Sequence, residues 1–327
     1  MRIYSGILSA VRVGALIALT FAFVVSSAQA AAPAPLLGIK GDPSRFQTLT
    51  GQDSQVHHVI VAWGQGQVWG SHFIDLFNQL GGIPMIGLAT SGKDGKEAIT
   101  PQQIAQGAGD SYLLALNGAV SQFAQEIYIR PFGEMNGYWN TYCAYTKTGV
   151  IKPHHQTTWF RKAFARVYLI VHGGPIADIN AQLKALGMPP VAGGDLPSNP
   201  FPMTRVVWNP QGYGSPNVPG NAAQAYYPGD KYVDLVGNDL YDIKGKAEWA
   251  ANEALYKAHP GKPYSFPEWG LWGIDDPAFV KKMADFVRAH KRTEMLAYFE
   301  SVPGSIFDLQ TKPLSKAAYR RYITSLG

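Results

Sequence analysis

The sequence predicts a single α/β domain with the (β/α)8 TIM-barrel fold, in which eight parallel strands alternate with helices. Three observations support this fold class. Short apolar segments of strand type alternate with helical segments from residue 35 onward, no change of composition marks a linker, and 327 residues suit one such domain. A doubly wound open sheet is the alternative, but no glycine-rich phosphate turn follows the first expected strand.

The first 30 residues are set apart from the barrel as a signal peptide. Basic residues precede an apolar stretch at residues 13–25, and Ala28 and Ala30 have the small side chains of a cleavage site. A retained membrane anchor is the alternative, although this stretch is short for a bilayer. We therefore expect cleavage near Ala30, a secreted or periplasmic protein without stable membrane insertion, and a barrel domain of residues 31–327.

Eight segments have the apolar character of buried parallel strands. Each is bounded by glycine, proline or polar residues, which punctuate strands of this kind. The expected strands are residues 35–40, 57–63, 83–89, 127–132, 205–208, 233–241, 262–268 and 295–299.

Helical segments lie between these strands, and several carry capping signals. Ser71 is a suitable N-cap, and Thr100 and Asp276 each precede a proline that can occupy the first helical position. Gly107 and Gly109 are expected to interrupt the helix that begins at Thr100. The expected helices are residues 71–80, 100–124, 154–172, a piece ending at 186, and residues 246–258, 276–290 and 315–326.

Composition and charge exclude several classes of partner. Removing Arg2 and Arg12 with the signal peptide lowers the net charge from +5 to +3, and no basic block remains, so nucleic acid is not an expected partner. Aromatic residues make up 12% of the chain and charged residues only 16%. This balance suits a polysaccharide or oligosaccharide, because aromatic faces pack against the C–H surfaces of sugars. We expect a monomer, with the single Cys143 as a buried small hydrophobe.

Two histidine pairs are the only motifs that suggest a metal, His57-His58 and His154-His155. Neighbouring residues of a strand point to opposite faces, and no HExxH motif or carboxylate cluster accompanies the pairs, so we expect structural roles. A G-x-S-x-G nucleophile elbow is also absent from the sequence. The sequence therefore predicts neither a metal nor an organic cofactor.

Two glutamates lie where expected strands end and aromatic residues gather. Glu134 follows the fourth strand in RPFGEMNGYW, and Glu268 ends the seventh in KPYSFPEWG. Active sites of (β/α)8 barrels form at these strand ends, and the fourth and seventh strands lie across the mouth of the barrel. Two facing carboxyl groups are what glycoside hydrolysis requires.

Other side chains near the expected strand ends are candidate sugar contacts. A core position is the alternative for several of the tryptophans, and capping of the local turn is the alternative for Asn136. At least one of Asp234, Asp239 and Asp242, around the sixth strand, is expected to cap or pair locally. The candidate contacts are Asn136, Trp139, Trp269, Trp63, Trp208 and Trp272.

In order and spacing, three segments resemble the signatures of family 26 glycoside hydrolases, the β-mannanase-like enzymes of the retaining (β/α)8 clan. The segments are RPFGEMNGYW, residues 226–242 and KPYSFPEWG. The resemblance implies that Glu134 is the general acid/base and Glu268 the nucleophile.

The resemblance also implies roles for neighbouring residues. Trp139 would line the sugar site, Tyr241 would hydrogen-bond the nucleophile, and Arg130 would support the carboxylates from below. Members of the family usually carry a histidine just before the acid, where this chain has Gly133. The tryptophan expected in the eighth strand is also missing, which leaves the preferred sugar open.

A retaining mechanism needs one protonated and one ionised carboxyl group. Burial against aromatic residues would raise the pKa of Glu134, while Arg130 and the Tyr241 hydroxyl would keep Glu268 charged. We expect the two carboxyl groups to lie about 5–5.5 Å apart, the separation that permits a covalent glycosyl-enzyme intermediate.

The sequence therefore predicts an exported retaining endo-β-glycanase that hydrolyses β-mannan, or a related β-glucan or xylan, by double displacement. Two alternatives stay open. One is a catalytically weak carbohydrate-binding barrel, motivated by Gly133. The other is a hydrolase that trims the cell's own exopolysaccharide.

Overall fold

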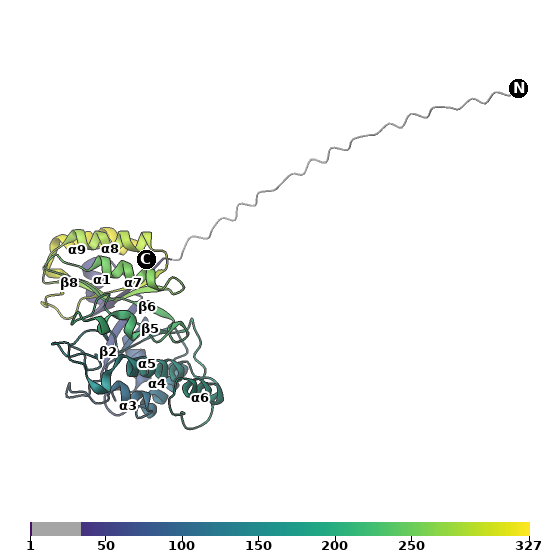
Figure 1. Ribbon diagram of the computed structural model, residues 1–327. Helices are drawn as coiled ribbons and strands as arrows, with labels where there is room; N and C mark the ends of the chain where they lie inside the picture. Colours follow the sequence, from purple (N-terminus) through teal and green to yellow (C-terminus); the bar gives the residue numbers. More distant parts are fainter. Residues whose placement is uncertain (2–33) are drawn as a thin grey trace. The chain divides into compact units, whose positions relative to one another are not determined.

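Nine strands make up one continuous parallel sheet in the part of the chain that the structure describes (Figure 1). The structure is a computed structural model that describes Met1 and residues 34–327. Residues 2–30 of the expected signal peptide, with the expected cleavage near Ala30, therefore lie outside the described residues. The strands are β1 (Leu36–Lys40), β2 (Val56–Val61), β3 (Ile83–Leu88), β4 (Ile127–Pro131), β5 (Thr204–Trp208), β6 (Leu235–Gly237), β7 (Leu240–Ile243), β8 (Tyr264–Trp272) and β9 (Thr293–Phe299).

Eight of these strands close into a barrel. Neighbours in sequence pair from β1 to β6, β1 pairs with β9, β9 pairs with β8, and β8 pairs with β6 to complete the ring. The predicted (β/α)8 fold class is confirmed.

The sixth position of the barrel differs from the expected single strand at residues 233–241. Asn238 and Asp239 separate β6 from β7, and both pieces pair with β8. The following strand continues to Trp272, beyond the end expected at Glu268, because it must reach far enough to pair with β7. The interruption places Asp239 at the mouth of the barrel.

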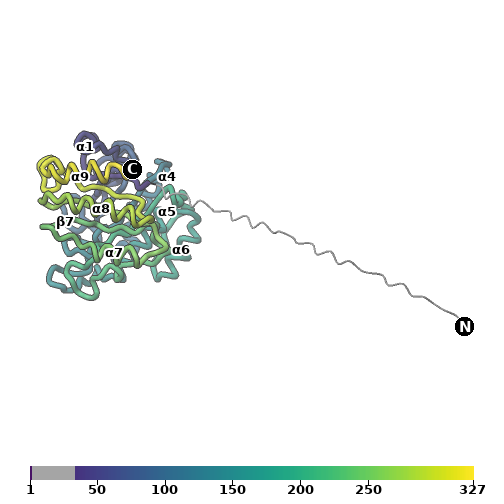
Figure 2. Tube along the Cα trace, turned by 90° about the horizontal axis from the view of Figure 1, so that it is seen from above, coloured from purple at the N-terminus to yellow at the C-terminus, as the bar shows by residue number. Residues whose placement is uncertain are grey.

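Helices cover the outside of the barrel. In Figure 1, α1, α7, α8 and α9 lie along one side of the strands, and α4, α5 and α6 lie along the other; Figure 2 shows the first group from above. The α-helices are α1 (Pro43–Thr50), α2 (Phe73–Leu80), α3 (Pro101–Ala105), α4 (Asp110–Phe123), α5 (Thr157–His172), α6 (Ile176–Ala185), α7 (Trp249–Ala258), α8 (Pro277–Ala289) and α9 (Pro313–Tyr322). Short 3₁₀ helices are η1 (Pro153–His155), η2 (Pro219–Asn221), η3 (Ala223–Tyr226), η4 (Asp230–Tyr232), η5 (Leu309–Thr311) and η6 (Thr324–Leu326).

Capping explains several helix starts. Thr100 and Gln103 form a reciprocal capping box, and the Asp276 carboxylate accepts hydrogen bonds from the first turn of α8. Asp42 caps α1 in the same way, a helix that the sequence analysis did not predict. The expected cap at Ser71 is wrong: α2 begins at Phe73, with His72 in the cap position and no side-chain cap bond.

The barrel has two apolar layers. A large cluster fills the space between strands and helices, while a smaller one fills the barrel interior. The strands present alternate residues to these layers, since successive side chains point to opposite faces. The interior cluster consists of Val56, Met85, Tyr128, Val207, Leu235, Met295 and Ala297.

The interior layer sets the floor of the mouth. Two residues beyond Val56, Tyr128 and Val207 in the chain come buried polar side chains, which are His58 in β2, Arg130 in β4 and Asn209 directly after β5. The apolar filling therefore ends in a polar layer at the carboxyl ends of the strands. None of the helices in the described part of the chain combines the length and hydropathy that crossing a bilayer requires.

Candidate active site

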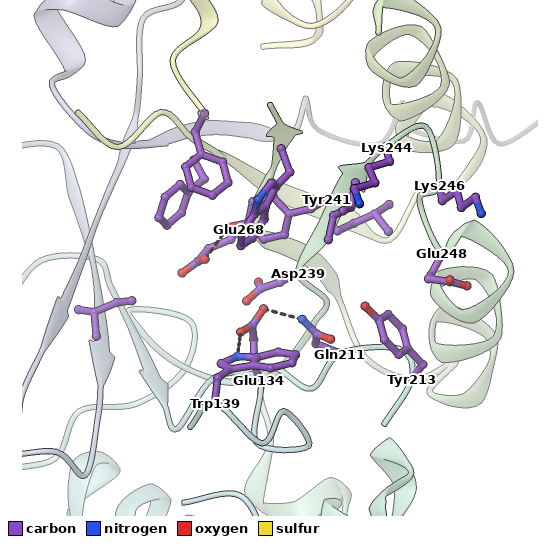
Figure 3. A pocket seen from close by; sticks show the side chains of 16 residues that line it. Glu134, Trp139, Gln211, Tyr213, Asp239, Tyr241, Lys244, Lys246, Glu248 and Glu268 are labelled. Atoms are coloured by element: carbon purple, nitrogen blue, oxygen red, sulfur yellow. Dashed lines mark hydrogen bonds between the residues drawn. The ribbon is translucent and has the colours of Figure 1, made fainter. Parts of the chain in front are cut away.

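A cleft of about 760 Å³ opens at the carboxyl ends of the strands. Glu134, which follows β4, and Glu268 of β8 both line it (Figure 3). Asp239 lies beside them, and Trp139 and Trp272 stand on the rim, each nearly half exposed. The barrel thus brings together two glutamates that are far apart in the sequence.

Arg130 is the centre of the polar layer beneath the cleft. Its guanidinium donates to Glu268 Oε1 at 2.7 Å, to Asn209 Oδ1 at 2.6 Å, and to Asp239. Only 3% of the arginine is exposed. Burial alone would lower its pKa, but the charges of Asp239 and then Glu268 raise it above the ordinary arginine value. The guanidinium therefore remains charged and fixes the Glu268 carboxyl group from below.

The second oxygen of Glu268 is also held. The Tyr241 hydroxyl donates to Glu268 Oε2 at 2.7 Å. Burial, followed by the charge of Glu268, raises the pKa of Tyr241 well above its usual range, so the hydroxyl keeps its proton. Glu268 therefore accepts one hydrogen bond at each carboxylate oxygen, one from a cationic donor and one from a hydroxyl group.

His58 completes the surroundings of Glu268. Its Nδ1 lies 3.7 Å from Glu268 Oε1, and its Nε2 lies 3.4 Å from Arg130 Nη1. Burial, and then the positive charges of Arg130 and Lys40, lower its pKa well below 6.5. The imidazole is therefore neutral and adds no second positive charge beneath the cleft.

Glu134 is held by two side chains from loops. Trp139 Nε1 donates to its Oε2 at 2.7 Å, and Gln211 Nε2 donates to its Oε1 at 2.8 Å. Burial is the largest influence on this carboxyl group and raises its pKa above the ordinary glutamate value. The negative charge of Glu268 raises it further, while the Gln211 and Trp139 bonds act in the opposite direction.

The backbone at Glu134 makes a sharp turn. Glu134 has a φ of 54°, an uncommon value for a residue with a side chain, and its N–H donates to Asn209 O at 2.7 Å. This bond ties the end of β4 to the end of β5. The turn aims the Glu134 side chain into the cleft in spite of its strained backbone.

Asn136 is a positioning residue in the loop layer. It is fully buried, and its side chain bonds the backbone of Gln211 in both directions as well as Tyr213 O. The loop after β5 is thereby fixed so that the Gln211 side chain reaches Glu134. Asn136 does not line the cleft, so the structure favours the alternative of a turn-capping side chain over the expected sugar contact.

The packing around residue 133 explains why this position is a glycine. A Cβ at this position would lie 2.6 Å from Arg130 Cζ, and it would therefore displace the guanidinium. The glycine also lines a recess of about 80 Å³ with Arg130, Tyr142 and both glutamates. The space that a side chain at residue 133 would need is used by Arg130.

The candidate tryptophans divide into two groups. Trp139 and Trp272 line the cleft, but Trp208 and Trp269 are completely buried and line no described pocket. Trp269 stacks on Tyr319 of α9. These two indoles belong to the core rather than to the cleft, because their strands turn them toward the helices.

Trp63 also lies away from the cleft. It is partly buried, packs on Tyr112 with ring centroids 4.5 Å apart, and is absent from the cleft lining. The structure therefore gives it a packing role beneath the loop after β2.

Three site residues were missed by the sequence analysis. Asp239 was one of three aspartates of which at least one was expected to cap or pair locally, and Asn209 and Gln211 were not singled out. A signal was present, since Asn209 and Gln211 directly follow the apolar strand β5, where polar residues of a barrel gather. Asp239 Oδ1 has no hydrogen-bond partner within residues 34–327, although it is buried at the cleft.

No cluster of three or more histidine, cysteine, aspartate or glutamate side chains in the described residues has an arrangement that could hold a metal ion. His57 instead contacts backbone carbonyls of Leu80 and Ser54, and His155 contacts Glu97. Cys143 is fully buried.

Comparison of the sequence finds neither a matching family model nor a matching curated protein. Comparison of the structure finds solved mannanases. One Bacillus subtilis mannanase is 16% identical with a TM-score of 0.56, over 90% of this chain and 86% of that one. Another from the same species is 16% identical with a TM-score of 0.53, over 90% and 87%. A family 26 β-mannanase from Bacteroides ovatus is 13% identical with a TM-score of 0.54, over 90% and 89%.

The architecture defines a closed (β/α)8 barrel with two glutamates in a cleft at its mouth. More particularly, the chain has the fold of the family 26 β-mannanases.

Proposed function

We propose that this chain is an exported glycoside hydrolase, a retaining endo-β-glycanase that cleaves a β-linked polysaccharide by double displacement. The contrast between two carboxyl groups in one cleft carries the proposal. Glu268 accepts bonds from Arg130 and Tyr241 that favour its charge, whereas burial and the charge of Glu268 raise the pKa of Glu134. One ionised and one protonated carboxyl group are the requirement of this chemistry.

In the first step the Glu268 carboxylate attacks the anomeric carbon, and the glycosidic bond breaks. Glu134 gives its proton to the departing oxygen, so the leaving sugar departs as an alcohol. Arg130 and Tyr241 hold both oxygens of Glu268 and thereby fix its orientation for attack.

In the second step Glu134, now ionised, takes a proton from water. The water oxygen attacks the anomeric carbon, the bond to Glu268 breaks, and the configuration at that carbon is retained. The bonds from Gln211 and Trp139 favour the ionised form of Glu134 that this step requires.

Exposed aromatic faces support a polymer as the substrate. Trp139 stands beside Glu134, and Trp272 packs edge-on against Tyr241. Both indoles remain nearly half exposed at the cleft, where they can stack on sugar rings. The neighbours in fold are named mannanases, which makes β-mannan the first polymer to test.

The experiment is a reducing-end assay of purified protein on β-mannan, mixed-linkage β-glucan and β-xylan. Glu134→Gln and Glu268→Gln should each abolish hydrolysis. Glu248→Gln, the same change at a cleft residue outside the proposed machinery, should retain hydrolysis of neutral polymers. Proton NMR should show the β anomer as the first product, and accumulation of the α anomer first would contradict retention.

A carbohydrate-binding barrel without hydrolysis is the second candidate, favoured by Gly133. In the resembling family a histidine occupies this position, whereas here Arg130 and a small recess fill the space. If the protein binds oligosaccharides but releases no reducing ends from any polymer of the panel, this candidate replaces the first. N-terminal sequencing of protein recovered outside the cytoplasm would test export and cleavage near Ala30.

A further inference from the structure

Two lysines extend one wall of the cleft beyond the two glutamates. Directly after β7 the chain makes a tight turn, in which Lys246 N–H donates to Ile243 O at 3.1 Å. Lys244 and Gly245, the two central residues of this turn, have φ values of 58° and 75°. Lys244 and Lys246 both line the cleft. The turn therefore holds the two lysines in one short, hydrogen-bonded segment of the cleft wall.

The turn conformation points to a use for the Lys244 side chain. Positive φ at both central residues is typical of a type I′ turn, for which asparagine, aspartate and glycine are favoured at the first of them. A lysine gains nothing from this backbone conformation. Figure 3 shows Lys244 reaching from the turn toward Tyr241, with Lys246 and Glu248 farther out along the same wall.

The two ammonium groups form no ion pair with the described residues. Among the ion pairs of residues 34–327, Lys257 and Lys281 each bind a carboxylate, but neither Lys244 nor Lys246 does. A third ammonium, Lys40 Nζ, lies 4.8 Å from the centre of the Phe299 ring, which lines the cleft.

Carboxylates near the cleft wall that carries Lys244 and Lys246 offset only part of the positive charge of these lysines. Glu248 lines the same wall, is exposed, and forms no ion pair with the described residues. Glu300 and Asp308, which follow β9, both bind Arg45. The wall beyond Tyr241 therefore presents more free positive than negative charge to a ligand.

We infer that the cleft binds a β-glycan bearing anionic groups, either sugar carboxylates or sulfate esters, and that Lys244 and Lys246 contact these groups. An ammonium is a point charge that pairs with either anion. The inference rests on the proposed function for the glycan nature of the ligand, and it narrows the substrate class. The low charged fraction of the whole chain indicates a neutral ligand, but two free lysines on a cleft wall are the more local observation.

Titration calorimetry tests the inference in the Glu268→Gln background, which prevents turnover. The probes are β-mannan and mixed-linkage β-glucan oligosaccharides, each in a neutral form, a form oxidised to the carboxylate at C6, and a sulfated form. At low ionic strength at least one anionic form should bind about three- to tenfold more tightly than its neutral parent. The preference should fall as salt is added.

The variant Lys244→Gln/Lys246→Gln should lose this preference and keep its affinity for neutral oligosaccharides. The control Lys257→Gln/Lys281→Gln makes the same change of net charge on helices α7 and α8 and should keep the preference. Equal affinity for neutral and anionic forms, or a preference that survives loss of the two cleft lysines, would overturn the inference.

Hydrolysis of the same polymers by the wild-type protein separates this inference from the proposed function. Hydrolysis without an anionic preference in binding would remove only the inference. An anionic preference without hydrolysis would support the inference for binding and remove the proposed enzyme activity.

Discussion

Glu134 and Glu268 are the same residue type at the mouth of one barrel, yet their surroundings differ. Glu268 is 7% exposed, belongs to a strand, and is bound by Arg130 and Tyr241. Glu134 follows a strand on a turn with positive φ and is bound by Trp139 and Gln211 from loops. Positively charged and hydroxyl donors hold the first glutamate, whereas neutral N–H donors hold the second.

This difference shows how one barrel can give two carboxyl groups opposite tasks. The buried cation beneath Glu268 stabilises a negative charge that stays in place. The half-buried Glu134 has no cation in direct contact and feels the charge of Glu268, so protonation costs it little. The proposed roles follow from electrostatic surroundings rather than from the residue type.

The largest expected effect comes from exchanging each glutamate for glutamine. Both variants should lose about a thousandfold or more in kcat on polysaccharide. Their activities on a dinitrophenyl glycoside should differ, because its leaving group needs no proton from an acid. Glu134→Gln should still release a burst of dinitrophenol, whereas Glu268→Gln should release none. A burst from Glu268→Gln and not from Glu134→Gln would reverse the assigned roles.

Removing the cation beneath Glu268 should be the next largest effect. Arg130→Met leaves Asp239 and Glu268 buried without their partner and should cost about 3–5 kcal/mol of unfolding free energy. Arg130→Met/Asp239→Asn should recover part of this loss, because one buried charge is removed with the cation. Urea denaturation measures both. Stability unchanged in the single variant would show that the buried network contributes nothing to the fold.

Tyr241→Phe removes one hydrogen bond to Glu268 and leaves the ring in place. A bond to a charged group is worth about 1.5–3 kcal/mol, which corresponds to roughly 10–100-fold in kcat if it is lost in the transition state. Tyr213→Phe, at another ring of the same cleft, serves as the control and should change kcat little. Equal effects of the two substitutions would remove the special role of the Tyr241 hydroxyl.

The pH dependence of activity tests the role of Glu134 as the acid. The proposed acid must be protonated, so activity should be present below the raised pKa of Glu134 and be lost as the pH rises through it. Gln211→Ala removes a donor that favours the ionised form, so it should move the alkaline limb of kcat/KM upward by up to about one pH unit. A limb that moves downward would contradict the assignment of this limb to Glu134.

The smallest effects separate the two groups of tryptophans. Trp272→Ala should raise KM about three- to tenfold, through the loss of stacking on a sugar ring, and should leave the melting temperature nearly unchanged. Trp269→Phe should lower the melting temperature by a few degrees and leave KM unchanged, because this indole packs on Tyr319. Thermal melts and steady-state kinetics of both variants show which tryptophan contacts the sugar and which one packs in the core.

Much of the barrel could be predicted from the sequence because its signals are local. Apolar runs ended by polar residues locate most of the strands, and Thr100 and Asp276 mark helix starts through their caps. The start at Asp42 and Pro43 carried the same signal and was overlooked. The split of the sixth strand was not predicted, although Gly237, Asn238 and Asp239 interrupt the apolar residues of this segment. Both pieces pair with β8 as the barrel closes.

The candidate site, like the fold, could be predicted only in part from the sequence. Glu134, Glu268, Arg130 and Tyr241 were predicted to come together, and the structure places the two glutamates and Tyr241 on the cleft lining, with Arg130 beneath Glu268. Placing Trp269 beside Glu268 as a sugar contact neglected strand alternation, since neighbouring residues of a strand face opposite sides. The pairing of β8 with β9 also has a register irregularity between Phe266 and Trp269.

The sequence by itself determined most of the segments that become strands, and that a glutamate lies near the carboxyl end of each of two distant strands, because these properties depend on neighbours along the chain. Only the tertiary structure decided that Arg130 lies beneath Glu268 and Asp239, that Gln211 reaches Glu134, and that two lysines share their cleft. The physical reason is closure of the barrel. Closure alone sets which strand ends are neighbours, and with them the charges that each carboxyl group meets.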